Sequence, residues 1–283
     1  TAPYRQVLTH GFTVDGDGKK MSKSLGNIIP AGKAMQDLGA DVLRLYVSAA
    51  DYRNEISASD EIFKRTADAY RRIRNTARFL LANLAGFDPV TDGLPVAQLL
   101  PLDRWILGQA RALQADVRTA YDDYQFHLVY HRIHNFCSGE LGGFYLDIIK
   151  DRQYTMGTDS LPRRSAQTSL FHLAEALCRW IAPILSFTAE ELWENLSGPR
   201  PASVFLAEWY EALPDVKSDD TLDTAFWSEM MAVRQQVNKA LELAREQGAL
   251  RGSLDADVAL YADPELAERL RSLGEELRFV LIT

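Results

Sequence analysis

Apolar residues recur every three or four positions over most of the chain, which is the pattern of amphipathic helices. Short loops separate the long helical stretches, and helices joined in this way pack as antiparallel neighbours in a bundle. The pattern therefore predicts a mainly α protein. The expected helices cover about 31–38, 41–49, 60–84, 101–117, 125–151, 162–180, 186–193 and 222–247.

Two of these helices begin with recognisable caps. Ser57 or Ser59 can cap the long helix, because a side-chain oxygen at that position accepts a hydrogen bond from the first turn. Pro183 interrupts the later helix, since proline lacks the backbone N–H that a helix interior needs. The sequence Thr188-x-x-Glu191 then predicts a capping box that restarts it.

Extended structure is predicted at few places. Residues 4–15 alternate between apolar and polar and read as a strand, and residues 51–57 look extended. An irregular, proline-rich stretch later in the chain contains one extended piece at 203–210. Two further strands, at 255–263 and 277–283, flank a short helix. Because the last strand reaches the final residue, we expect its module to continue beyond this chain.

The expected elements divide into three modules. Residues 1–58 form a small α/β module, residues 59–198 form an antiparallel helix bundle, and residues 199–283 form a linker and an α/β module that the chain cuts through. Alternate helices of a bundle run in the same direction. The loop 84–101 and the segment 150–154 are therefore expected to share the bundle end that lies far from the first module.

Composition limits the classes of function. The chain has 283 residues, of which 47% are hydrophobic, and a net charge of −8, which argues against a general polyanion binder. No apolar run approaches the ~20 residues that span a bilayer, and no secretory signal is visible. Cys137 and Cys178 lie inside helical apolar patterns, so we expect buried thiols in a reducing, cytoplasmic compartment.

The clearest chemical motif is the loop GKKMSKSLGN, whose centre reads KMSKS. The preceding DGDGKK resembles the start of a calcium loop, but Lys19 occupies the place of the third ligand, so no metal is expected there. Two ammonium groups on a glycine-bracketed loop suit a phosphate chain whose charge shifts as pyrophosphate leaves. An ordinary exposed turn is the alternative. The motif residues are Lys20, Met21, Ser22, Lys23 and Ser24.

A basic stripe marks the first long helix. Six basic residues and only one acid, Asp68, lie between positions 64 and 78. This stripe is either a solvated face or a contact to a nucleic-acid backbone, because phosphate contacts supply affinity without reading sequence. The candidates for phosphate contact are Lys64, Arg71, Arg72 and Arg78.

Two further groups have competing interpretations. His127, His131 and His134 share one helical face, but no carboxylate or thiolate joins them, so a surface stripe is expected rather than a metal site. At the end of the third bundle helix, cations are favourable for dipole reasons alone. The alternative is contact with splayed RNA bases through amides and aromatic rings. The residues concerned are Lys150, Arg152, Gln153 and Tyr154.

Longer stretches resemble the bacterial isoleucyl-tRNA synthetase family. KMSKS is a signature of class I aminoacyl-tRNA synthetases, and the segment 51–61 is more similar to the isoleucyl family than to its valyl, leucyl or methionyl relatives. The resemblance implies that residues 1–58 are a stem-contact module with the KMSKS loop, that 59–198 are an anticodon-binding bundle, and that 199–283 are a truncated junction module. The stretches are GADVLRLYVSAADYRNEI, LDRWIL, FYLDIIKDRQY and WIAPILSFTAEELW.

The same resemblance implies a chemistry. Lys20 and Lys23 would stabilise the triphosphate of ATP, a substrate that arrives with magnesium, in the transition state of isoleucine activation. The aminoacyl group would then be transferred to isoleucine tRNA. The basic stripe would contact the tRNA backbone, and the segment 150–154 would face the anticodon loop. The family is expected to act as a cytoplasmic monomer.

The resemblance also implies which parts lie elsewhere. The HIGH motif, most of the catalytic domain, the editing domain and the cysteine-rich zinc module of the family fall outside this chain. We therefore expect the isolated chain to be inactive and to hold no zinc. Two alternatives stay open: a non-enzymatic tRNA-binding helical protein, and the valyl-tRNA synthetase paralogue.

Overall fold

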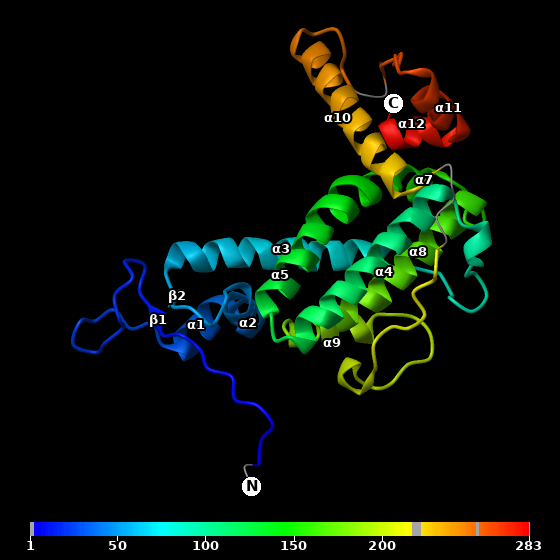
Figure 1. Ribbon diagram of the computed structural model, residues 1–283. Helices are drawn as coiled ribbons and strands as arrows, with labels where there is room; N and C mark the ends of the chain where they lie inside the picture. The colour runs from blue at the N-terminus through cyan, green and yellow to red at the C-terminus, as the bar shows by residue number, and fades with distance from the viewer. Residues whose placement is uncertain (1–2, 217–221, 253–254, 283) are drawn as a thin grey trace.

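The computed structural model describes residues 3–216, 222–252 and 255–282, and it is mainly helical, as predicted (Figure 1). A π-helix, η2 (Cys137–Tyr145), joins α5 to α6, and short 3₁₀ turns form η1 (Val96–Gln98) and η3 (Val204–Leu206). The helices are α1 (Ala31–Leu38), α2 (Ala40–Ala49), α3 (Asp60–Asn83), α4 (Pro101–Asp122), α5 (Phe126–Phe136), α6 (Leu146–Ile148), α7 (Lys150–Thr155), α8 (Leu161–Ile181), α9 (Ser186–Glu194), α10 (Thr224–Glu246), α11 (Pro264–Ser272) and α12 (Glu276–Leu281).

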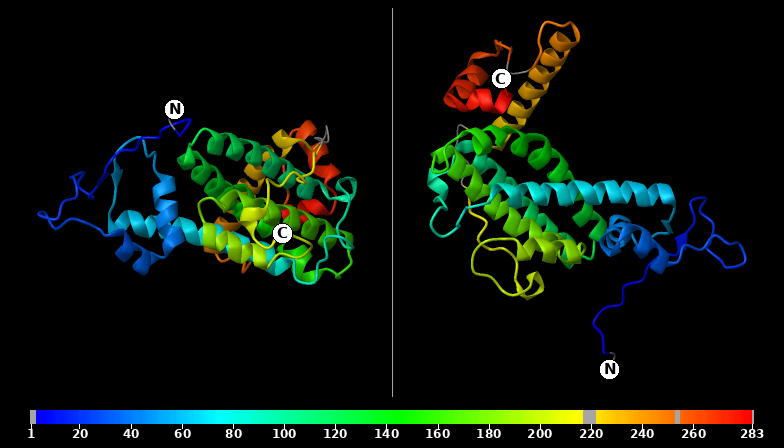
Figure 2. Two further views of the ribbon diagram at one scale, coloured as in Figure 1. Left: turned by 90° about the horizontal axis from the view of Figure 1, so that it is seen from below. Right: turned by 180° about the vertical axis from the view of Figure 1, so that it is seen from behind.

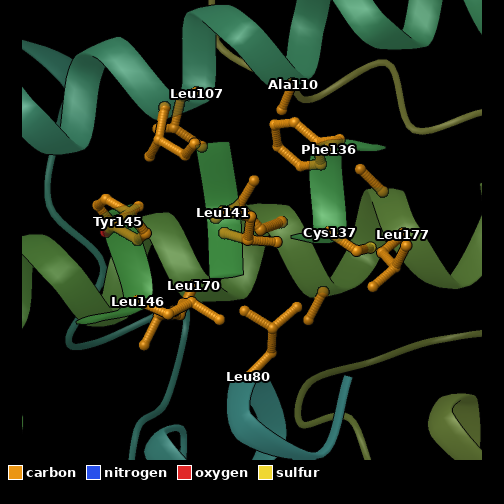
Figure 3. Packing of buried hydrophobic residues seen from close by; sticks show 14 of the residues in the cluster. Leu80, Leu107, Ala110, Phe136, Cys137, Leu141, Tyr145, Leu146, Leu170 and Leu177 are labelled. Carbon is orange, nitrogen blue, oxygen red and sulfur yellow. The ribbon is translucent and has the colours of Figure 1, made fainter. Parts of the chain in front are cut away.

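The bundle packs around the π-helix η2. Figure 3 shows Leu141 of η2 between Leu107 of α4 on one side and Leu80 of α3 on the other, with Leu170 of α8 close by. All four side chains are at most 1% exposed. The expected bundle of long helices is therefore present, and one element at its centre departs from α-helical geometry.

The departure lies within the predicted helix 125–151. The chain is helical there, but nine residues adopt π-helical geometry. A Cβ on Gly142 would lie 2.4 Å from the carbonyl oxygen of Cys137, so the backbone of this turn leaves no room for a side chain. Both Cys137 and Cys178 are buried, as predicted. Burial raises the pKa of each thiol to about 12.

The N-terminal module contains less sheet than predicted. Within residues 3–58, only β1 (Thr13–Val14) and β2 (Ile56–Ser57) form strands, and they pair in parallel. The rest of the predicted strand 4–15 runs as an extended segment away from the molecule (Figure 1). Its apolar side chains are largely exposed, with Val7 at 64% and Phe12 at 68%. The strand prediction fails for residues 4–10, which have no backbone hydrogen bond to a neighbouring strand among the described residues, whereas Gly11 and Phe12 still bond to Tyr52 and Ile56.

Helix α2 binds the break between α8 and α9. The carboxylate of Asp41 accepts hydrogen bonds from the backbone N–H groups of Phe187 (3.3 Å) and Thr188 (2.7 Å) in the first turn of α9. Arg44, one turn later, donates to the backbone carbonyls of Pro183 (2.7 Å) and Ile184 (2.8 Å). The carboxylate of Asp41 thus accepts from N–H groups at the start of α9, and the guanidinium of Arg44 donates to carbonyls just after the end of α8. Helix dipoles favour an anion at a helix start and a cation at a helix end.

The predicted capping box at Thr188 is therefore wrong. Helix α9 begins at Ser186, so Thr188 lies inside the first turn and does not cap it. Its hydroxyl donates to Asp41 instead (2.6 Å). The cap comes from another helix, 147 residues away in sequence. Ser59, in contrast, caps α3 as expected by accepting from the N–H of Ile62.

The C-terminal part differs from the predicted α/β module. Residues 256–263 have no regular structure, and α12 occupies most of the predicted strand 277–283, of which residue 283 lies outside the described residues. Val280 and Leu281 of α12 are buried, because a continuous apolar run fits a buried helix as well as a strand. The predicted extended piece 203–210 contains η3 and is otherwise irregular. No strand occurs in residues 222–252 or 255–282.

We predict that Asp41→Ala destabilises the chain by about 1–3 kcal/mol, since it removes a helix cap and leaves the buried N–H of Thr188 without its acceptor. Urea unfolding measures the loss. Asp37→Ala, at an exposed position on the neighbouring helix α1, is the matched control and should change the free energy of unfolding by less than about 0.5 kcal/mol. Equal stability of the two variants would show that the contact between α2 and α9 contributes little.

Candidate functional site

The base of the KMSKS loop is closed by Asp15 and Asn27. One carboxylate oxygen of Asp15 accepts from the N–H of Lys19 (2.8 Å) and the other from the side-chain amide of Asn27 (2.8 Å). Asn27 in turn accepts from the N–H of Ser22 (2.9 Å). The Asn27 hydrogen bond, with those from the backbone, keeps the pKa of Asp15 below its ordinary value. The two side chains hold the ends of the loop together.

The tip presents the motif cations to solvent. Lys20 and Lys23 are exposed, and within residues 3–216, 222–252 and 255–282 neither ammonium has an ion-pair partner. The hydroxyls of Ser22 and Ser24 lie 3.1 Å apart beside them. Met21 points the other way and packs against the small apolar cluster around Tyr46 and Phe63. One motif residue therefore anchors the loop, and the other four are available to a ligand.

Sequence analysis missed Asp15 and Asn27. Asp15 precedes the glycine-rich turn Gly16–Gly18, a position where an aspartate commonly bonds to the backbone that follows it. That signal was present in the sequence. Nothing local marks Asn27, because its partner lies 12 residues away.

The basic stripe lies on the open side of α3. Figure 2 (right) shows α3 crossing the molecule with no element over it. Half of the cations are compensated: Arg65 pairs with Glu61, Arg71 with Asp68, and Arg74 with Glu191. The cations of the stripe that lack an ion-pair partner among the described residues are Lys64, Arg72 and Arg78.

Of the four candidate residues on α7, at the far end of the bundle, two are exposed and two are buried. Lys150 has a half-exposed side chain and Tyr154 is 66% exposed. Arg152 is 0% and Gln153 3% exposed. The expectation that Arg152 and Gln153 face the anticodon loop conflicts with this burial, because neither side chain reaches the surface. Residues 150 and 154 share one helical face, and Arg152 and Gln153 point into the protein.

Arg152 belongs to a buried ion-pair network. Its guanidinium lies 3.2 Å from the carboxylate of Asp103, and both side chains are completely buried. Asp103 also accepts from the hydroxyls of Tyr145 (2.7 Å) and Ser165 (2.5 Å). On its other side Arg152 pairs with Glu276 of α12. The network ties α7 to α4, η2, α8 and the C-terminal part, and it fixes the segment that carries Lys150 and Tyr154.

The loop 84–101 lies at the same end of the bundle as α7, as predicted. The N–H of Leu94 donates to Thr168 of α8 (3.1 Å), and the N–H of Leu100 donates to Ser165 (2.8 Å). Gln153 donates to the carbonyl of Arg163 at the start of the same helix (3.4 Å). The KMSKS loop lies beyond the opposite end of α3 (Figure 1). With 24 residues, α3 separates the two ends by about 36 Å at 1.5 Å per residue.

The three histidines lie along α5 with Tyr130 beside them. Its ring centroid is 4.9 Å from that of His131 and 5.6 Å from that of His134. Burial, and then the neighbouring His127 and His134, lower the pKa of His131. In the part of the chain that the structure describes, no group of three His, Cys, Asp or Glu side chains has metal-binding geometry. In that same part, no helix is both long enough and apolar enough to cross a membrane.

We predict that Arg152→Met lowers the free energy of unfolding by about 3–5 kcal/mol, because it leaves the carboxylate of Asp103 buried without its counter-ion. Lys150→Met removes a cation from a surface ion pair on the same helix and should cost less than about 1 kcal/mol. Thermal and urea unfolding of both variants give the comparison. An Arg152→Met chain as stable as Lys150→Met would contradict a structural role for Arg152.

Comparison with known proteins identifies the family. A family model described as the anticodon-binding domain of tRNA ligase matches residues 103–260, and one described as tRNA synthetases class I (I, L, M and V) matches residues 1–59. The isoleucine–tRNA ligase of Marinomonas sp. (strain MWYL1) is 59% identical over 280 residues, which cover 99% of this chain and 30% of the relative. That of Photorhabdus laumondii is 60% identical over 282 residues, which cover 100% of this chain and 30% of the relative. The chain thus spans about 30% of the length of these relatives.

A solved structure supports the fold. The LeuRS of Agrobacterium radiobacter K84, in a ternary complex with tRNA and LeuAMS, has a TM-score of 0.52 and 20% identity. The match covers 74% of this chain and 23% of that one. Because the model of the anticodon-binding domain matches more than half of the chain, the chain belongs to the family defined by the anticodon-binding domain of tRNA ligases.

Proposed function

We propose that this chain is the part of an isoleucine–tRNA ligase that carries the KMSKS loop and binds the anticodon arm of tRNA. The whole enzyme would activate isoleucine with ATP and magnesium, release pyrophosphate, and transfer the aminoacyl group to isoleucine tRNA. The observation that carries the proposal is that α3 joins two parts. One is a loop whose two ammonium groups have no ion-pair partner among the described residues, and the other is a helical bundle that matches the model of the anticodon-binding domain. The relatives, which are 57–60% identical and named as isoleucine–tRNA ligases, favour isoleucine over valine as the substrate.

The proposed role of the loop follows from its charge and its frame. Lys20 and Lys23 would approach the triphosphate as negative charge builds up on the departing pyrophosphate. The hydroxyls of Ser22 and Ser24 would donate hydrogen bonds to the same oxygens. Asp15 and Asn27 would keep the four groups on one short loop, so that they arrive together.

The proposed tRNA contacts divide by their chemistry. Lys64, Arg71, Arg72 and Arg78 on α3 would neutralise backbone phosphates, with Arg71 first leaving its pair with Asp68. Lys150 and Tyr154 on α7 would meet the anticodon loop, where an exposed aromatic ring can stack on an unpaired base. Arg152 and Gln153 would support α7 from beneath rather than touch RNA.

In the full-length enzyme, Lys23→Ala should lower the rate of isoleucine-dependent ATP–pyrophosphate exchange by roughly a hundredfold or more, as the loss of one charge-stabilising donor does elsewhere. Lys19→Ala is the matched control: Lys19 lies in the same loop but turns towards Asp17, and its replacement should leave the rate close to that of the wild type. If Lys23→Ala weakened ATP binding and left the activation rate unchanged, the role in the transition state would be wrong.

Binding of isoleucine tRNA to this chain should weaken steeply as salt rises. Lys64→Gln and Arg78→Gln should each reduce the slope of log affinity against log salt by about 0.7–0.9, the contribution of one phosphate contact. Arg65→Gln, on the same helix but paired with Glu61, should leave the slope unchanged. Wild-type slopes for both Lys64→Gln and Arg78→Gln would mean that this face is only solvated surface.

Tyr154→Ala should reduce discrimination against non-cognate tRNAs with little effect on the slope.

A further inference from the structure

One carboxylate beside the proposed anticodon contact serves two cations. Lys150 on α7 lies 2.9 Å from one oxygen of Asp147, and Arg234 on α10 lies 2.5 Å from the other. The side chains of Lys150 and Asp147 are 52% and 37% exposed, whereas that of Arg234 is only 7% exposed. The arrangement is therefore asymmetric: one cation faces solvent and the other lies within the protein.

Arg234 is held in place by more than its ion pair. Its guanidinium lies 5.4 Å from the ring centroid of Phe144 and donates to the backbone carbonyl of that residue (3.4 Å). Trp227 and Met230, on the same helix, are buried and anchor α10 against the bundle. Lys150 has no comparable restraint, since its described polar contact is the one with Asp147. Of the two cations, only Lys150 can leave without disturbing the fold.

We propose that Arg234 is a positioning residue that frees Lys150 to bind an RNA phosphate, an inference that rests on the proposed contact between Lys150 and tRNA. If Lys150 moved to a phosphate in the absence of Arg234, the half-buried carboxylate of Asp147 would be left unpaired beside a polyanion. With Arg234 present, the carboxylate keeps a counter-ion throughout. Lys150 then exchanges one anion for another without exposing RNA to an uncompensated negative charge.

The local charge supports this reasoning. Burial tends to raise the pKa of Asp147, but the hydrogen bonds and charges of Lys150 and Arg234 outweigh it and keep the pKa below its ordinary value. Asp147 is therefore ionised at neutral pH. The three side chains carry a net charge of +1, and the same group without Arg234 would be neutral. A buried residue that does not reach the surface thus makes this end of the bundle attractive to phosphate.

The test uses this chain and an isoleucine tRNA transcript, with affinity measured by titration at fixed salt. Lys150→Gln and Arg234→Gln should each weaken binding by roughly fivefold, about the upper strength of one solvent-exposed ion pair. Arg234→Lys, which keeps the charge, should bind more tightly than Arg234→Gln. The double variant Lys150→Gln, Arg234→Gln leaves Asp147 with neither of these two cations, and it should bind no more tightly than either single variant.

Removal of Asp147 separates the electrostatic role from a structural one. Asp147→Asn in the Arg234→Gln background should restore affinity to that of the wild type or better, since the carboxylate that retains Lys150 is gone. Asp147→Asn alone should bind at least as tightly as the wild type, and this variant leaves the packing of Arg234 on Phe144 in place. Thermal unfolding of each variant shows whether the fold is kept.

The outcomes distinguish the role of Arg234 from the contact between Lys150 and RNA. If Lys150→Gln weakens binding but Asp147→Asn fails to rescue Arg234→Gln, the proposed role of Arg234 is wrong and the contact of Lys150 with RNA stands. The same holds if Asp147→Asn alone weakens binding. If Lys150→Gln binds as the wild type does, the contact itself is wrong, and the role of Arg234 falls with it.

Discussion

The contact of α2 with the break between α8 and α9 sets the relation between the two parts of the molecule. The N-terminal module has little apolar surface of its own to bury: its sheet has two residues per strand, and its core cluster is built on Tyr46, Ala58 and Phe63. Asp41 and Arg44 compensate for this by satisfying backbone groups that the break exposes in the bundle. Hydrogen bonds of this kind are directional, so they fix orientation as well as contact. Together with α3, which runs from the N-terminal module into the bundle, they fix the position of the KMSKS loop relative to the bundle.

Cationic side chains have two different roles in this chain, and the burial of each side chain determines its role. On the open face of α3, Lys64 and Arg78 are hydrated and available to phosphate, and salt would screen their effect. Arg152 and Arg234 are removed from water, and each is held by a carboxylate at short distance. Because an unpaired buried charge is costly, these pairs restrain the helices that carry them. The surface cations would therefore bind, while the buried ones would shape the surface from which binding takes place.

Sequence periodicity located the helices and the exposed face of α3, because one face of a long helix must repeat every three or four residues. The expectation that Arg152 and Gln153 face RNA came instead from the chemistry of their side chains, which says nothing about burial. Arg152 is buried because it pairs with Asp103 and Glu276, which lie far from it in sequence. The cap from Asp41 and the bond between Asp15 and Asn27 could not be predicted either, since each joins residues far apart in sequence. The KMSKS residues were found because they are contiguous.

Helix α3 makes the two proposed sites parts of one body. Near its start Phe63 packs in the cluster that anchors Met21 of the loop, and near its end Leu80 lies in the core of the bundle. A continuous helix of 24 residues does not bend easily without a proline or a glycine, and α3 contains neither. A tRNA held on the bundle would therefore take up a set position relative to the module that carries the loop. Binding free energy gained far from the reaction would then serve to orient the reacting groups, which is how remote contacts accelerate a reaction without touching it.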